Sequence, residues 1–258
     1  MNTSHLYSST TYMGLVESVS LESETFTLEL GNGRKIIVGI SKETYFDVLR
    51  NVGDISRDRT QEPSEEELKQ SDIVILNFPN NPTSANISLE ELSQWVEKAL
   101  KYDFVLINDE CYSEIFFDEN KKPPSLLEAS IAAGNKEFKN ILVMNSISKR
   151  SSAPGLRSGF VAGDSKILKE YMKYRTYIGC ASPLPLQKAA ASAWNDEKHV
   201  QGFRDIYKKN FEIARELLGI KIPDATFYIW LEVENELEFT QKLYEQKNIK
   251  VLPGSLLG

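Results

Sequence analysis

Short apolar runs that alternate with a helical pattern constrain the fold of this chain more than any other feature. Four runs rich in branched residues occur in order, "DIVILNF", "FVLIND", "NILVMNS" and "SGFVAGD". Between the first two lies "SLEELSQWVEKALKYD", where apolar residues recur at helical spacing and Ser88 with Glu91 forms a capping-box pattern. A strand, a helix and a second strand in this order predict a parallel sheet whose strands are buried on both faces.

Polar residues follow three of these runs, at the point where each predicted strand ends. Asn77 precedes "PNNPTS", Asp109 begins "DECY", and Ser146 begins "SISK". Because ligands of α/β sheets bind at the carboxyl ends of the strands, we expect these residues to open onto one edge. Each also has a purely structural interpretation, since Asn81 suits a turn, Asp109 a helix cap and Tyr112 a core. Their occurrence together favours a binding site.

The stretch "SISKRSSAPGLRSG" places one lysine among hydroxyl residues and an arginine eight positions later. The ordinary interpretation is that Lys149 and Arg150 are solvated charges in a loop after a strand. The alternative is a lysine amine that forms a Schiff base, with serine hydroxyls and Arg157 placed for a phosphate group.

Composition excludes several other classes of function. The 258 residues carry a net charge of −7 without a basic stripe, so we expect no nucleic-acid partner. The sequence contains no apolar run of the ~20 residues that a membrane helix needs, and its start lacks a signal-peptide pattern, so we expect no membrane partner and a cytoplasmic location. Two cysteines and two histidines suit neither a disulfide framework nor a metal site. A small-molecule function fits this composition.

Residues 1–60 differ in texture from the rest and predict a β-rich segment of unknown role. "YMGLVESVSL", "ETFTLEL" and "RKIIVGI" alternate apolar and polar side chains, and Asn32-Gly33 is a hairpin signal. The next stretch, "SKETYFDVLRNV", predicts a short helix that begins after Ser41. A charged, apolar-poor stretch then marks a boundary between about residues 52 and 70.

The C-terminal part predicts helices and a small α+β unit. Helical spacing recurs in "SKILKEYMKYRTYIG", "PLPLQKAAASAWND" and "EKHVQGFRDIYKKNFEIARELLG". Residues 71–200 are expected to form the larger domain. Residues 201–258 are expected to form a smaller one, with strands at "ATFYIWLEV" and "IKVLPG" and a helix at "ELEFTQKLYEQKN". Lys188 and Arg204 are interpreted as surface charges.

The motifs "NNPTS", "NDECY" and "SISKRSSAPGLRSG", in this order along one sheet, resemble the signature of fold-type I aminotransferases of class I/II. Those enzymes use pyridoxal 5′-phosphate. The form "SKRSSAPGLRSGFVAGD" is more similar to N-succinyldiaminopimelate aminotransferases of bacterial lysine biosynthesis. The resemblance covers about residues 71–258. It implies an α/β fold in which a parallel-rich sheet flanked by helices forms part of the large domain.

The resemblance also implies roles for three residues around the cofactor ring. Asn81 matches the asparagine that binds the phenolic oxygen and the substrate carboxylate. Asp109 matches the carboxylate that pairs with the pyridine nitrogen and keeps it protonated. Tyr112 matches the tyrosine that supports the phenolic oxygen.

Four further residues match the attachment point and the phosphate site. Lys149 corresponds to the catalytic Schiff-base lysine, which must be neutral to act as a nucleophile and base although its ordinary pKa is about 10.4. Ser146 and Ser148 correspond to the hydroxyls of its loop, and Arg157 to the phosphate-binding arginine. A dianionic phosphate favours a guanidinium fork together with hydroxyl donors.

The resemblance implies transamination of N-succinyl-L,L-diaminopimelate with 2-oxoglutarate, and thus small amino-acid and 2-oxo-acid partners and a homodimer. Two alternatives stay open: a C–S lyase that uses the same cofactor, and a truncated or fused binding module without activity. The family's upstream phosphate loop, ring-stacking aromatic and downstream arginine have no clear counterpart, with Tyr45 and Phe46 as weak aromatic candidates. We therefore expect this chain to bind the cofactor weakly and to turn over little or nothing.

Overall fold

The computed structural model describes residues 63–179 and 181–256 together with the backbone of four N-terminal strands. These strands are β1 (Leu15–Ser20), β2 (Thr25–Glu29), β3 (Lys35–Gly39) and β4 (Asp47–Arg50). The first three form an antiparallel sheet, as the alternating pattern predicted, whereas Asn32-Gly33, Tyr45 and Phe46 lie outside the described residues. The helix expected over 41–52 is wrong at 47–50, because β4 pairs there with the central sheet, and the rest of that stretch lies outside the described residues.

The central sheet has the strand order β4-β5-β6-β7-β8. Its other strands are β5 (Ser71–Leu76), β6 (Val105–Asp109), β7 (Ile141–Ser146) and β8 (Gly159–Gly163). Strands β5, β6 and β7 run parallel, whereas β4 and β8 are antiparallel to their neighbours. The predicted parallel-rich sheet is therefore confirmed, and its two edge strands run the opposite way.

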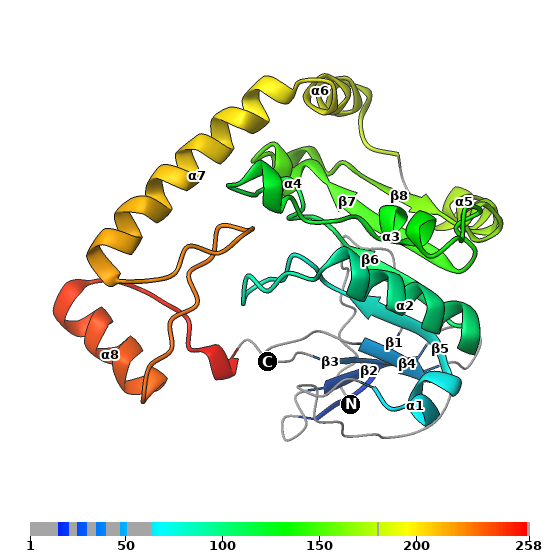
Figure 1. The fold of residues 1–258 in the computed structure, drawn as a ribbon, viewed down its shortest axis with the longest axis horizontal. Helices are drawn as coiled ribbons and strands as arrows, with labels where there is room; N and C mark the ends of the chain where they lie inside the picture. The colour runs from blue at the N-terminus through cyan, green and yellow to red at the C-terminus, as the bar shows by residue number, and fades with distance from the viewer. Residues whose placement is uncertain are drawn as a thin grey trace.

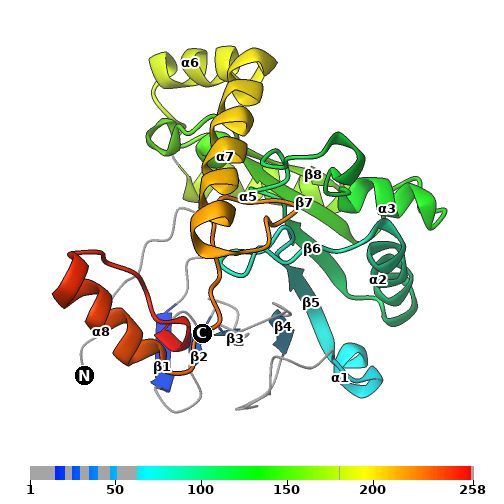
Figure 2. The same ribbon diagram turned by 60° about the vertical axis from the view of Figure 1, so that its left-hand side comes forward.

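Three helices pack near the β5–β7 part of the sheet, namely α1 (Glu65–Lys69), α2 (Leu89–Tyr102) and α3 (Leu126–Ala132). Helices α2 and α3 lie side by side (Figure 2). Ser88 and Glu91 form the predicted capping box at the start of α2. The core lies between these helices and the strands, and includes Val74, Leu76, Leu92, Trp95, Val96, Phe104, Leu106, Leu126, Ile141 and Val143.

Burial of the inner strands is less complete than the sequence predicted. Val74 and Leu76 of β5 are fully buried, whereas Ile73 and Ile75 on the alternate positions are only half-buried. The same holds for Val105 in β6. Since successive strand residues point to opposite faces, the face away from α2 and α3 is less well covered. The expectation that the strands are buried on both faces is wrong at these positions.

The remaining helices and turns lie outside the α1–α3 layer, and among them α5 contacts β8. They are α4 (Ile147–Arg150), α5 (Ser165–Ile178), α6 (Leu184–Trp194), α7 (Glu197–Leu218) and α8 (Glu236–Lys247), with short 3-10 turns at η1 (Glu119–Lys121), η2 (Pro154–Leu156) and η3 (Gly254–Leu256). Residues 165–256 are called the C-terminal arm below. Figure 1 shows the long α7 running from α6 toward α8 on the far side of the molecule from α2. The helices expected in the arm are confirmed.

The two strands expected in the arm are absent from the described residues. "ATFYIWLEV" makes one isolated bridge, between Ala225 and Phe116, and Thr226 N donates to the Ile115 carbonyl at 2.9 Å. "IKVLPG" has no strand partner within the described chain. No helix of the described part is both long and apolar enough to span a bilayer.

Candidate functional site

The carboxyl ends of β6 and β7 lie next to each other, as the strand order predicted. Asp109 is the last residue of β6 and pairs in register with Met144 of β7. Strand β7 ends at Ser146, and α4 begins at the next residue and carries Lys149. The sheet therefore brings Asp109 and the Lys149 segment to one edge.

Lys149 lies against aromatic rings from two distant parts of the chain. Its Nζ is 5.4 Å from the centroid of the Tyr112 ring and 5.3 Å from that of the Phe227 ring. The hydroxyls of Tyr112 and Tyr228 are 2.6 Å apart. Both distances lie within the range in which a lysine head group is attracted to an aromatic ring face. The arm thus reaches the site through Phe227 and Tyr228, which sequence reasoning missed because "ATFYIWLEV" alternates like a strand.

Tyr112 is buried, and this fixes its charge state. Burial raises the pKa of the Tyr112 phenol far above its ordinary value, and the hydrogen bond with Tyr228 raises it further. The phenol therefore stays protonated and remains a hydrogen-bond donor. Burial also raises the pKa of the neighbouring Cys111 thiol, with the nearby Asp109 carboxylate as a second cause. A neutral thiol of this kind is a poor nucleophile.

The loop after β5 is tied to β6 by side-chain amides. Asn108 accepts from Phe78 N at 3.1 Å and donates to the Phe78 carbonyl at 3.2 Å. Asn80 is fully buried, and its Oδ1 accepts from Thr83 N at 3.0 Å, while its Nδ2 has no partner among the described residues. The adjacent Asn81 is exposed. The loop is therefore anchored by its buried amide, and Asn81 is left accessible.

The two serines before Lys149 lie together. Ser146 Oγ lies 2.8 Å from Ser148 Oγ and 3.1 Å from the Ser158 carbonyl, and it accepts from Ser148 N at 3.0 Å. Arg157 adopts a left-handed backbone with φ of 50°. Its exposed guanidinium donates to the Pro154 carbonyl at 2.9 Å, and within the described chain it bonds to neither serine. The structure therefore brings the serines together but leaves the Arg157 head group at the surface.

Arg150, next to Lys149, is an anchor rather than a solvated charge. Its side chain is 3% exposed and donates to the Ala193 carbonyl at 2.9 Å. It also pairs with Glu197 and stacks over the Trp194 ring at 5.4 Å. The interpretation of Arg150 as a loop charge is wrong, because these contacts fasten α4 to the end of α6 and the start of α7.

The donor set at this edge fits the pyridoxal phosphate that the sequence resemblance implies. An amine, a carboxylate, a protonated phenol and two hydroxyls suit its aldehyde, ring nitrogen, phenolic oxygen and phosphate. These groups belong to Lys149, Asp109, Tyr112, Ser146 and Ser148. The neighbouring Asn80 Nδ2, buried without a partner, is a spare donor close to Asn81.

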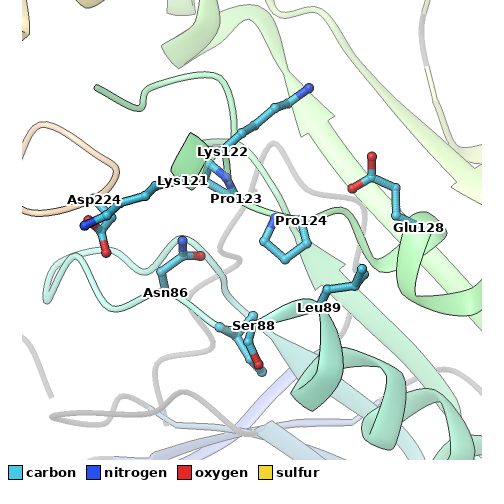
Figure 3. Close-up of a pocket in the computed structure, with 10 residues that line it drawn as sticks. Asn86, Ser88, Leu89, Lys121, Lys122, Pro123, Pro124, Glu128 and Asp224 are labelled. Carbon is cyan, nitrogen blue, oxygen red and sulfur yellow. The ribbon is translucent and has the colours of Figure 1, made fainter. Parts of the chain in front are cut away.

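Two cavities are lined by residues other than Lys149, Asp109 and Tyr112. One of about 610 Å³ lies at the start of α2, where Figure 3 shows Asn86 pointing into the hollow and Lys121 beside Asp224. Lys121 Nζ is 3.1 Å from an Asp224 carboxylate oxygen. The second, of about 620 Å³, lies between Thr83–Ala85 and residues 218–224 and 228–232, so Tyr228 borders it. Neither lining contains Lys149.

Comparisons with known sequences agree with the motifs. The family model of aminotransferase class I and II matches residues 54–258. An LL-diaminopimelate aminotransferase of Natranaerobius thermophilus is 36% identical over 200 residues, which are 74% of this chain and 50% of that protein. The chain thus spans about half the length of the curated relatives it matches.

Solved structures give the same result. Aminotransferase AspB from Helicobacter pylori is 51% identical with a TM-score of 0.74, over 78% of this chain and 54% of that one. An aminotransferase from Neisseria meningitidis is 42% identical with a TM-score of 0.72, over 76% of this chain and 51% of that one. A probable N-succinyldiaminopimelate aminotransferase from Thermus thermophilus, at 24% identity and a TM-score of 0.67 over 76% of this chain and 53% of that one, shares the fold.

Proposed function

We propose, on the premise that this chain belongs to the aminotransferase class I and II family, that it transfers an amino group between an amino acid and a 2-oxo acid. Members of this family depend on pyridoxal 5′-phosphate. The position of Lys149, directly after β7 and against Tyr112, carries the proposal. The chain spans about half the length of its relatives, so its catalytic activity is itself proposed here and is not inferred from theirs.

The residues at the edge have distinct roles in this proposal. Bound pyridoxal phosphate supplies an aldehyde carbon and an electron-accepting ring. Lys149 Nζ holds the cofactor and, when neutral, takes and returns a proton. Asp109 provides the negative charge for the ring nitrogen, and the protonated Tyr112 donates to the phenolic oxygen.

The phosphate and the substrate are assigned to the remaining residues of the set. The Ser146 and Ser148 hydroxyls donate to the phosphate, and the exposed Arg157 guanidinium turns from the Pro154 carbonyl toward it. Asn81, accessible on its anchored loop, binds the substrate carboxylate.

The substrate that we propose is N-succinyl-L,L-diaminopimelate, with 2-oxoglutarate as the acceptor. Two considerations support the diaminopimelate skeleton: the form of the Lys149 motif, and relatives named for LL-diaminopimelate. Those relatives are named for the compound without the succinyl group, so both compounds belong in a substrate panel with aspartate as a third donor. If LL-diaminopimelate or aspartate gave a higher kcat/KM than the succinyl compound, the proposed substrate would be wrong.

The function is tested first by fixing the cofactor on the protein. The chain is incubated with pyridoxal phosphate, reduced with borohydride and digested, and the labelled peptide is identified by mass spectrometry. We expect the label on Lys149 and its loss in Lys149→Arg, with the exposed Lys166 and Lys169 of α5 unlabelled at stoichiometric cofactor. Label on α5 instead would refute the assignment. No label at all would favour a binding module without activity.

Asp109→Ala separates binding from chemistry. This variant is expected to retain measurable cofactor binding and to lose transamination, because the ring nitrogen is no longer held protonated. Single-turnover conversion of bound cofactor by the amino donor measures the loss. Full activity in Asp109→Ala would place the site elsewhere.

A further inference from the structure

One buried carboxylate beside the site has no role in the chemistry above. Glu110 follows Asp109 directly and is only 4% exposed. Its Oε1 accepts three hydrogen bonds, from Leu126 N at 2.7 Å, from Ser125 Oγ at 3.2 Å and from Asn108 Nδ2 at 3.2 Å. Two of these donors belong to the start of α3 and one to β6. A buried carboxylate that binds two elements at once holds them in a fixed relation.

The chain of hydrogen bonds continues from Asn108 to the loop after β5. The Asn108 amide both donates to and accepts from the Phe78 backbone. The bonds thus run from α3 through Glu110 and Asn108 to the loop that carries Asn81. We call Phe78, Asn108, Glu110, Ser125 and Leu126 the Glu110 network.

The network leaves Asp109 free for a ligand. Successive strand residues point to opposite sides, so Asn108 turns into the core while the next side chain, Asp109, turns the other way. Asn108 is fully buried, whereas Asp109 is half-buried and accepts from Cys111 N at 3.0 Å, with the Cys111 thiol as a second neighbour of its carboxylate. The anchors therefore lie on both sides of Asp109 in sequence and do not occupy its carboxylate.

We propose that Glu110 and Asn108 are positioning residues, which set the loop of Asn81 and the carboxylate of Asp109 relative to each other through the start of α3. The network itself is a property of the free protein, whereas its consequence for cofactor binding rests on the proposed function. The two parts can therefore fail separately.

The charge of Glu110 gives the network a pH dependence. Burial raises the pKa of Glu110 to about 7, against the opposing effect of its three hydrogen bonds, and the Glu128 carboxylate on α3 raises it further. The other titratable groups nearby are Asp109 and Cys111 on the same segment and Lys149 on α4, and Asp109, Lys149 and Glu110 all act on the Cys111 thiol. A raised pKa means that the closed network binds a proton more tightly than an opened one, whose carboxyl titrates near 4.5. The equilibrium constant for opening the Glu110 network is therefore expected to increase roughly tenfold from pH 6 to pH 8.

Hydrogen exchange in the free protein tests the network directly. The reporters are the amides of Phe78, Asn80, Ser84 and Leu126, each of which donates a hydrogen bond in the structure. In Glu110→Leu, which removes the acceptor, exchange at these amides is expected to rise at least tenfold at pH 6. Glu97→Gln, a charge loss on the exposed face of α2, is the matched control and is expected to change none of them. Unchanged exchange in folded Glu110→Leu would overturn the proposal.

Glu110→Gln keeps an acceptor oxygen but cannot ionise. It therefore tests the role of Glu110 in the network even if Glu110→Leu does not fold. After correction for the intrinsic pH dependence of exchange, the wild-type protein is expected to open roughly tenfold more at pH 8 than at pH 6. In Glu110→Gln the network is expected to open to the same extent at pH 6 and at pH 8. An equal pH dependence in the two proteins would refute the role of Glu110.

Cofactor titration then separates the network from the function. If the wild-type chain binds pyridoxal phosphate, Glu110→Leu is expected to bind it at least tenfold more weakly, and the ratio of the Glu110→Gln affinity to the wild-type affinity to increase from pH 6 to pH 8. Equal affinities despite faster exchange would show that the network does not position the site. If no variant binds the cofactor, the proposed function fails, and the exchange results still decide whether the network exists.

Discussion

Helices α2 and α5 both contain 14 residues, yet α2 buries one face in the core whereas α5 fully buries none of its described side chains. Helix α2 buries Leu92, Trp95, Val96 and Ala99 between the sheet and α3. Helix α5 fully buries none of its described side chains, and its Met172 and Tyr177 are 63% and 84% exposed. Both helices follow a clear N-cap, Ser88 for α2 and Asp164 for α5. The two sequences therefore specify helices equally well, but only α2 is inserted into a core.

This contrast extends to the whole C-terminal arm. Its fully buried apolar side chains are Ala190, Val200, Phe211 and Ala225 within the described residues. Phe211 packs on Phe117 with ring centroids 5.1 Å apart, and Arg204 lies 4.0 Å from the Phe116 ring centroid. A few anchors thus fasten the arm, whereas a continuous apolar cluster holds the sheet and its helices together.

The largest effect is expected from a cavity in the sheet layer. Phe104→Ala empties a site that is 0% exposed, so the free energy of unfolding is expected to fall by about 3–5 kcal/mol. Leu217→Ala removes an apolar side chain that is 75% exposed on α7, so its change is expected to stay within about 0.5 kcal/mol. Urea denaturation monitored by tryptophan fluorescence compares the two. Similar losses would mean that the arm has a core of its own.

An intermediate effect is expected at the main anchor of the arm. Arg204 donates to the Glu114 carbonyl at 2.8 Å and pairs with the Glu114 carboxylate at 3.0 Å, so its interpretation as a surface charge is wrong. Arg204→Met leaves that carboxylate without its partner and is expected to lower the free energy of unfolding by about 2 kcal/mol. Lys188→Met on α6 removes an exposed charge and serves as the control, with a change near zero. A null result for Arg204→Met would show that the arm is held elsewhere.

The smallest effect is expected from removing a helix cap in each region. Ser88 caps α2 and Asn235 caps α8, each by accepting from a backbone N–H in the first turn. Replacement of either by alanine removes about 1 kcal/mol from its helix. For Ser88→Ala the loss is expected in global unfolding, because α2 is part of the core. Since α8 fully buries no residue, Asn235→Ala is expected to speed amide exchange in α8 alone, and a global loss there would contradict the comparison.

Local patterns predicted the elements well wherever a segment determines its own structure. Helices α2, α5, α6, α7 and α8 follow from spacing and caps, and strands β5 to β8 from compact branched runs. The segment "ATFYIWLEV" was predicted wrongly as a strand. Alternating apolar and polar residues give a segment one apolar face, but they do not provide a second strand to pair with. A strand exists only where a second segment pairs with it, and here Phe116 offers one bridge. The helix expected at 41–52 was wrong because a partner does exist there: the free edge of β5 pairs with residues 47–50, which form β4.

The site was predictable only as far as the motifs reach. Asp109, Tyr112 and Lys149 could be named from the sequence because each follows a predicted strand, and the structure places Lys149 against Tyr112. Phe227 and Tyr228 lie over a hundred residues from Tyr112 in the chain, and no local signal connects them.

The sequence by itself determined strands β5 to β8, helices α2 and α5 to α8, the position of polar residues at strand ends, and the family. Those properties depend on side chains near one another in the chain. Only the tertiary structure decided that Arg150 and Glu110 are buried and partnered, that Arg204 is half-buried and paired with Glu114, that Arg157 is exposed, and that the arm reaches Lys149. Burial and charge state depend on which distant segment covers a side chain, and neither spacing nor composition records that contact.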